Sequence, residues 1–203
     1  MVSLNIMKKN DFKHIAKEVI QKEINSLKKL RSNINFSFNK AVETILKCKN
    51  GKIILSGVGK SGIIAKKISA TFASTGTPSF FLDASNASHG DMGQISSNDV
   101  LILISHSGET NELKNIIQFA SRNKKIVLIG ITSKKNSLLY QNSNINLHLP
   151  EVSEADPANI VPTCSTIVQL SIGDALAIAC MRARGFSKLD FKNFTHQAHC
   201  QLN

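Results

Sequence analysis

Short apolar runs that alternate with helical stretches limit the folds open to this chain more than any other feature. The runs are Ile53–Leu55, Val100–Ile104 and Ile126–Ile131, with two further ones at Phe80–Leu82 and Ile145–Leu149. Continuous apolar strands are typically buried on both faces of a sheet, and strands separated by helices pair in parallel. The sequence therefore predicts a doubly wound α/β fold, a three-layer αβα sandwich with a five-stranded parallel sheet.

Helical periodicity accounts for most of the remaining chain. Residues 11–30 carry apolar side chains at spacings of three and four, which indicates an amphipathic helix, and a second helix is expected over about residues 38–48. Further helices are expected near residues 61–74, 111–122, 137–141 and 166–184. We therefore expect one domain over residues 1–203, with two N-terminal helices and a core of about residues 38–185.

Composition narrows the class of protein. The 203 residues suit one domain. No continuous apolar run approaches the roughly 20 residues that span a bilayer, the N-terminus lacks the pattern of a secretory signal, and the four cysteines form no C-x-x-C pair. We expect a soluble cytoplasmic protein with reduced thiols and no membrane partner.

The net charge of +11 raises the question of nucleic-acid binding. The lysines, however, are spread in pairs along the whole chain, and a single tyrosine is available for base stacking. Solvation of the general surface is therefore favoured over nucleic acid as a partner. A positive field would also attract an anionic small-molecule substrate.

The first predicted strand ends in the glycine-rich turn Gly57–Gly62, which fits G-x-G-x-x-G between a strand and a helix. Asp83 follows the next strand, about where a ribose-binding acid of a dinucleotide site would lie. Lys60 and Ser61 inside the turn instead suit a terminal phosphate monoester. A Walker A loop is excluded, because Ile54 stands five residues before Gly59 where that motif has glycine.

A second hydroxyl-rich turn, Ser105–Thr110, follows the third strand and opens a helix. Helix N-termini offer free N–H groups and positive partial charge, so such a turn can hold a phosphate. Two facing turns would enclose a small sugar phosphate, whereas a nucleotide needs only one. The alternative is that Ser105, Ser107 and Thr110 merely cap the helix.

Several separated motifs recur here in a known order. They are the Gly57–Gly62 turn, residues 73–78 (ASTGTP), 87–91 (ASHGD), 105–110 (SHSGET), 162–166 (PTCST) and 173–176 (GDAL). Over about residues 10–199 the chain resembles the sugar isomerase (SIS) domain of the arabinose 5-phosphate isomerases. This resemblance implies conversion of D-ribulose 5-phosphate to D-arabinose 5-phosphate for 3-deoxy-D-manno-octulosonate synthesis, and thus for lipopolysaccharide or capsule. It further implies an enediol intermediate, no redox cofactor and a homotetramer.

The resemblance places four catalytic positions on Lys60, Glu112, Glu154 and His196. Lys60 would face the enediolate or the phosphate, and we favour Glu154 as the general base. Glu112 alternatively serves a helix dipole. His196 would reach a neighbouring subunit, although its segment lacks the family's Ser-His-Pro-Gly-Gly ending and His199 is an alternative.

Substrate contacts are expected from the turns and from the motifs around them. The expected residues are Gly59, Ser61, Gly76, Thr77, His89, Ser105, Ser107, Thr110, Thr163 and Ser165. The alternative for His89 is a structural role, in which its side chain holds its loop in place by a hydrogen bond to the backbone. No metal is expected, because Asp83 stands where the family often has a histidine and ligand spacing is lacking. His106 replaces a frequent asparagine, and either adds charge at low pH or hydrogen-bonds the turn.

Two rival functions remain open on the sequence. One is a SIS isomerase for a hexulose or heptose phosphate, and the other is a non-catalytic sugar-phosphate sensor. Longer family members continue into a pair of CBS modules. Because this chain stops at Asn203, we expect activity without CBS regulation unless a separate protein supplies it.

Overall fold

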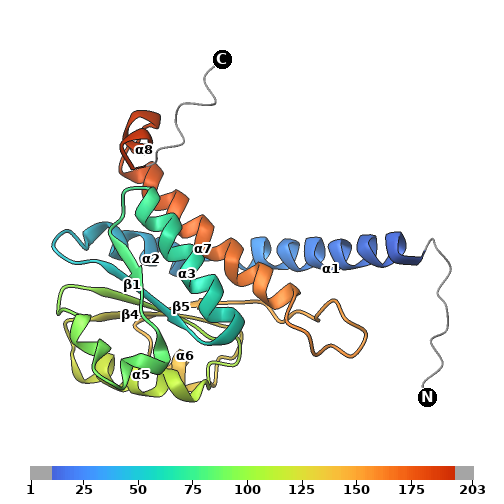
Figure 1. Cartoon of the computed structure of the whole chain (residues 1–203), viewed down its shortest axis with the longest axis horizontal. Coiled ribbons are helices and arrows are strands. Elements are labelled where there is room, and N and C mark those ends of the chain that lie inside the picture. Colours follow the sequence, from blue (N-terminus) through green and yellow to red (C-terminus); the bar gives the residue numbers. More distant parts are fainter. Residues whose placement is uncertain (1–10, 195–203) are drawn as a thin grey trace.

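The computed structural model describes residues 11–194 and contains a five-stranded, entirely parallel sheet of order β2-β1-β3-β4-β5 (Figure 1). The strands are β1 (Ile53–Gly57), β2 (Ser79–Phe81), β3 (Val100–Ile104), β4 (Val127–Thr132) and β5 (Ile145–His148). The helices are α1 (Asp11–Asn33), α2 (Phe36–Lys47), α3 (Gly59–Ser74), α4 (Ala84–Ala87), α5 (Lys114–Arg122), α6 (Leu138–Asn142), α7 (Cys164–Ala183) and α8 (Lys188–Phe194), with short 3-10 helices η1 (Asp91–Gln94) and η2 (Asn111–Leu113). The predicted doubly wound α/β fold is confirmed.

Both faces of the sheet are covered at its centre, which explains why the inner strands β1, β3 and β4 are mostly apolar and buried. Successive side chains of a strand point to opposite faces. In β3, Ile102 packs into the core shared with α2, α3 and α7, whereas Leu101 and Leu103 pack into the core shared with α5 and α6. Figure 1 shows these helix layers on the two sides of the sheet. A strand of this kind must be buried on both sides.

The long helix α7 is the centre of one layer and confirms the helix expected near residues 166–184, although no continuous apolar run reveals how apolar it is. Among residues 11–194, it is the one helix long and apolar enough to cross a membrane by length and composition, and half of its apolar window is buried. Polar residues such as Gln169 and Asp174 interrupt its sequence, so no unbroken run reveals it. It packs against α1, α2 and α3 (Figure 1). Its apolarity is accounted for by its place in the core.

Gly173 lets α7 approach α3 closely, and Gly173→Ala is expected to destabilise the fold. A Cβ there would lie 2.1, 2.5 and 3.0 Å from three atoms of the buried Ile68 side chain. Because Ile68 is 1% exposed, its side chain has little free space to move into, so the overpacking outweighs the gain of about 1 kcal/mol in helix propensity. We expect a net loss of about 1–2 kcal/mol in the free energy of unfolding by urea denaturation.

The matched control is Gly93→Ala, because a Cβ at Gly93 meets nothing within 4 Å. In an Ile68→Val background, which lacks the nearest methyl group, the cost of Gly173→Ala should shrink. An equal cost in both backgrounds would show that the contact with Ile68 is not its cause.

Candidate functional site

A cavity of about 430 Å³ lies at the carboxyl ends of β1 and β3. This is the point where the strand order reverses, and ligands of open α/β sheets bind in such a crevice. Its lining comes from the turn after β1, the turn after β3, residues 149–163 (the 149–163 loop, between β5 and α7) and the start of α7. The lining residues are Val58, Lys60, Ser61, His106, Val152, Glu154, Asn159, Ile160, Pro162, Ser165, Thr166 and Gln169. The two turns singled out in the sequence therefore share one cavity.

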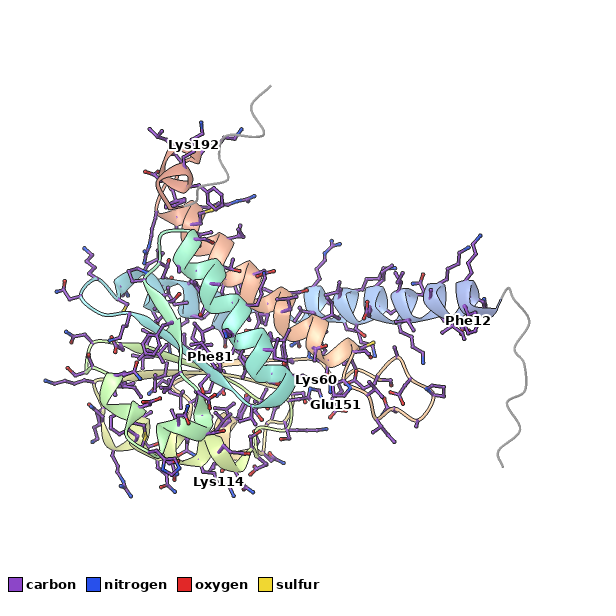
Figure 2. The ribbon with its side chains drawn as sticks, in the orientation of Figure 1. Phe12, Lys60, Phe81, Lys114, Glu151 and Lys192 are labelled. Atoms are coloured by element: carbon purple, nitrogen blue, oxygen red, sulfur yellow. The ribbon has the colours of Figure 1, made fainter. Side chains whose placement is uncertain are left out.

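The first turn presents a helix N-terminus and a cation to this cavity. Gly59 adopts φ +58°, and a Cβ at Gly57 would lie 2.9 Å from the carbonyl oxygen of Ser61, so the turn requires glycine at both positions. The residue before α3, Val58, gives no side-chain cap. Lys60 is exposed at the start of α3, near the 149–163 loop (Figure 2). This end of α3 attracts an anion.

The second turn uses its hydroxyl groups largely to hold itself together. Ser105 Oγ lies 2.8 Å from Thr110 Oγ1 and accepts a 2.9 Å hydrogen bond from the Gly108 N–H. Ser107 Oγ accepts from the Glu109 N–H at 3.2 Å. None of the three hydroxyl residues is part of the cavity lining. The turn contributes His106 to the cavity instead, which sequence analysis had not placed among the substrate contacts.

His106 is half-buried, and Ser133 contacts both its side chain and its backbone carbonyl. Its Nε2 lies 3.4 Å from Ser133 Oγ, and the same hydroxyl donates to the His106 carbonyl at 2.9 Å. Burial lowers the pKa of His106; Glu154 raises it and Lys134 lowers it to smaller extents. The imidazole is therefore neutral at pH 7. The sequence left two roles open for His106: charge at low pH, or a hydrogen bond to its turn. The structure shows a side-chain contact with Ser133, the residue after β4.

Glu154 connects the 149–163 loop to the start of α7. Its Oε2 accepts from the Thr163 N–H at 2.7 Å, from Thr163 Oγ1 at 3.1 Å and from the Ser165 N–H at 3.2 Å. Burial raises the pKa of Glu154, but the hydrogen bonds from Ser165 and Thr163 together outweigh it, so the pKa lies below its ordinary value of 4.5. Glu154 is thus a fixed carboxylate in the cavity wall.

Thr163 and Ser165, which the sequence predicts to bind substrate, donate hydrogen bonds to Glu154 in this structure. The Thr163 hydroxyl also accepts from the Ala155 N–H at 2.8 Å. Thr163 is not in the lining, whereas the buried Ser165 is.

Gly76 and Thr77 are not brought to this cavity by the described chain, so their role in substrate binding stays a prediction. They follow α3 and precede β2, so they lie at the amino edge of the sheet, opposite the cavity. Gly76 ends the helix at φ +82°, with the Phe186 ring 2.5 Å from where a Cβ would stand, and its carbonyl accepts from Arg184 at 2.8 Å. Thr77 is 2% exposed. Both positions serve packing within the described chain.

The remaining predicted residues lie apart from the cavity or outside the described chain. Glu112, in η2, and His89, after α4, are exposed and are absent from the lining. His196 and its alternative His199 lie outside residues 11–194.

Asp83 lies beside a separate hollow of about 230 Å³ on the other side of the glycine-rich turn. Its carboxylate caps α4 by accepting from the Ser85 N–H at 2.8 Å. Within residues 11–194, no group of three His, Cys, Asp or Glu side chains is placed to hold a metal ion.

Gln169 is the lining residue most easily missed in the sequence. It is 1% exposed and stands four residues after Ser165, so the two share one face of α7. A long polar side chain between Val168 and Leu170, one helical turn after the 162–166 motif, is the signal that could have identified it. The tip of the 149–163 loop, with Asn159 and Ile160, carries no comparable signal.

Comparison with known proteins identifies the family of the chain. Residues 45–179 match the model of the SIS domain family. Arabinose 5-phosphate isomerase KdsD of Francisella tularensis subsp. tularensis is 47% identical over 183 residues, which cover 89% of this chain and 55% of that protein. KdsD of Escherichia coli (strain K12) is 43% identical over 181 residues, with 89% and 55% covered. The chain thus spans about half the length of the curated relatives it matches.

A solved structure of a protein from E. coli CFT073, in complex with arabinose 5-phosphate, has a TM-score of 0.88 and 37% sequence identity, over 93% of this chain and 99% of that one. The family match covers well over half of this chain and includes the glycine-rich turn, the second turn and most of α7. The chain therefore belongs to the SIS domain family.

Proposed function

We propose that the protein is an aldose–ketose isomerase that interconverts D-ribulose 5-phosphate and D-arabinose 5-phosphate through an enediol, for 3-deoxy-D-manno-octulosonate synthesis. The observation that carries the proposal is the meeting of Lys60, His106 and Glu154 around one cavity at the switch point of the sheet. The KdsD relatives and the neighbour structure in complex with arabinose 5-phosphate support the choice of substrate.

Isomerisation moves a proton between carbons 1 and 2 of an open-chain sugar. It requires a base near that proton and positive charge or a hydrogen-bond donor near the developing oxyanion. We assign the phosphate to the N-terminus of α3, beside Lys60, because free N–H groups and an ammonium group favour a dianion. The sugar chain then extends towards Glu154, the carboxylate of the cavity wall. No step in this scheme calls for a redox cofactor.

A sugar-phosphate sensor is the second candidate, favoured by a specific observation. One oxygen of Glu154 is occupied by three hydrogen bonds, and Glu112 is absent from the cavity lining. A carboxylate with a lowered pKa is a weaker base than one tuned towards neutrality.

Two measurements separate these functions. Turnover is compared on ribulose 5-phosphate, fructose 6-phosphate, sedoheptulose 7-phosphate and hexulose 6-phosphate; the absence of pentulose turnover would reject the proposal. Exchange of the carbon-2 proton of arabinose 5-phosphate into deuterated water is then followed. A sensor would bind the sugar phosphate without exchange.

A homotetramer in the cytoplasm is proposed as the working form. Helix α1 extends beyond the rest of the molecule (Figure 1) and exposes apolar side chains, with Phe12 68% and Ile20 55% accessible. Such an apolar helix face favours association. In the tetramer, His196 would reach the cavity of a neighbouring subunit. Sedimentation equilibrium measures the assembled mass, and a monomer at micromolar concentration would contradict this.

Lys60→Met is expected to weaken the binding of inorganic phosphate roughly tenfold to a hundredfold, because a charge-assisted hydrogen bond contributes about 1.5–3 kcal/mol. Titration calorimetry measures the dissociation constant. Lys125→Met is the matched control: it removes the same charge from an exposed position just before β4, at the opposite edge of the sheet. Equal weakening by both variants would assign the effect to the general field and not to Lys60.

A further inference from the structure

Two polar groups beneath the proposed sugar site have no partner. Gln169 Oε1 and His106 Nδ1 are both buried, and neither has a hydrogen-bond partner among the described residues. Both residues line the same cavity. A buried polar atom without a partner costs about 1–3 kcal/mol, so each such atom calls for an explanation.

Gln169 stands where the core would accept an apolar side chain. It is 1% exposed, and its neighbours along α7, Val168 and Ile172, are buried in the main core. Leucine or methionine would fill the same space without an unpaired amide. The fold itself therefore gives no reason for glutamine at this position, whereas the cavity beside it does.

The hydrogen bonds of Ser133 determine what His106 offers to the cavity. The contact of the Ser133 hydroxyl with the His106 carbonyl, at 2.9 Å, is shorter than its contact with Nε2, at 3.4 Å. With its hydrogen directed to the nearer carbonyl, the hydroxyl oxygen accepts from Nε2. Nε2 then carries the proton, and Nδ1 of the neutral ring is a bare acceptor. Like Gln169 Oε1, it calls for a hydrogen-bond donor.

The two sides of the cavity thus differ in chemistry. On one side, Lys60 and the N-terminus of α3 offer positive charge and N–H donors, which suit a phosphate. On the other side, Gln169 Oε1, His106 Nδ1 and the Glu154 carboxylate offer acceptors. A phosphate dianion has no hydrogen to give them, whereas a hydroxyl group has. A hydroxyl also satisfies the Gln169 amide in either orientation of its end, because it both donates and accepts.

We propose that Gln169 and His106 are positioning residues that bind the hydroxyl groups of the ligand's carbon chain and so select phosphorylated polyhydroxy compounds over plain alkyl phosphates. The inference deepens the proposed function and rests on it only for the identity of the sugar. A site built to hydrogen-bond a hydroxyl rejects an analogue that lacks it, because its own buried groups are then left unpaired.

The test compares three probes by titration calorimetry: arabinose 5-phosphate, pentyl phosphate and inorganic phosphate. Pentyl phosphate has a carbon chain of the same length without hydroxyl groups. We expect the wild-type protein to bind arabinose 5-phosphate at least about tenfold more tightly than pentyl phosphate, and Gln169→Leu to reduce that ratio by about tenfold. The affinity for inorganic phosphate should stay unchanged. Gln118→Leu, at an exposed position of α5, is the matched control.

A second variant and a stability measurement keep the test decisive. Gln169→Met retains the length of the side chain and should lower the ratio in the same way. Because both variants remove an unpaired buried amide, their melting temperatures should equal or exceed that of the wild type. His106→Leu should also reduce the ratio, by removal of the second acceptor.

Three results would overturn the inference: equal affinity of the wild type for arabinose 5-phosphate and pentyl phosphate, an unchanged ratio in both Gln169 variants, or an equal loss for all three probes. The last would show a purely structural role or a bound water as the partner. Failure of the proposed function looks different. In that case the wild type discriminates between the probes but catalyses no isomerisation of any pentulose phosphate.

Discussion

Glu154→Gln is expected to lower the turnover of ribulose 5-phosphate by roughly 10²–10⁴ while the affinity for inorganic phosphate stays the same. Glutamine has the shape of glutamate and retains one oxygen that can accept from Thr163 and Ser165, but it cannot take a proton at neutral pH. The proposed phosphate contacts lie at the other side of the cavity, at the start of α3. The effect should therefore appear in kcat, as measured by steady-state kinetics.

The control for this variant is Glu151→Gln. Glu151 stands three residues earlier in the same loop, is exposed, and pairs with Lys134 at 2.5 Å. An exposed ion pair contributes at most about 1 kcal/mol, so turnover should change little. A loss of less than about tenfold in Glu154→Gln would move the role of base to Glu112 or His196.

The pH dependence provides a second check on Glu154. Its pKa in the folded protein is lowered, so its hydrogen bonds to the start of α7 stabilise the fold above pH 4.5, and this contribution is lost as the pH falls through the folded-state pKa. Glu154→Gln should remove this part of the acid dependence of stability. It should also cost about 1 kcal/mol at neutral pH, because the neutral amide oxygen accepts these hydrogen bonds more weakly than the carboxylate does.

The fold could be predicted from the sequence because burial on both faces leaves a direct mark on it. The runs at Val100–Ile104 and Ile126–Ile131 are apolar because helices cover both sides of β3 and β4. The apolar character of helix α7 was harder to see in the sequence, since it shows in the average hydropathy of the helix and not in an unbroken apolar run. Its central position follows from packing against three other helices, which no local pattern encodes.

The site could be predicted only in part, for a topological reason. Lys60 and Glu154 follow strands β1 and β5, and residues that follow parallel strands meet at the carboxyl edge of the sheet. Gly76 and Thr77 follow a helix and precede a strand, and that order alone assigns them to the amino edge. Their predicted contact with substrate rests on the resemblance alone, since the topology places them away from the cavity of their own chain.

The hydroxyl-rich turn and Gln169 show two other limits of sequence reasoning. The hydroxyl groups of Ser105 and Thr110 could equally bind a ligand or hold the turn, and only coordinates distinguish these uses. Gln169 could not be assigned to the cavity until the face of α7 that contacts the 149–163 loop was known.

Asp99→Ala is expected to cause the largest loss of stability, about 3 kcal/mol in the free energy of unfolding. Asp99 is 1% exposed and accepts from the Lys52 N–H at 2.9 Å, the Ser96 N–H at 2.7 Å and Lys52 Nζ at 2.9 Å. These bonds join the segment before β1 to the segment before β3 at the amino edge of the sheet. Alanine would leave two backbone N–H groups without their acceptor, each at a cost of about 1–3 kcal/mol.

The Lys52 ammonium group contributes less to this cost, because 34% of its side chain is exposed and can turn to water. Lys52→Met should therefore destabilise the protein by about 1 kcal/mol, and Asp99→Asn, which retains an acceptor, should fall between Lys52→Met and Asp99→Ala. Urea denaturation measures all three variants.

Since Asp99 lies at the edge opposite the cavity, the fraction of Asp99→Ala that remains folded should bind inorganic phosphate with unchanged affinity. A loss of stability below about 1 kcal/mol would mean that water replaces the carboxylate at this junction, and a change in phosphate affinity would mean that the two edges of the sheet are coupled.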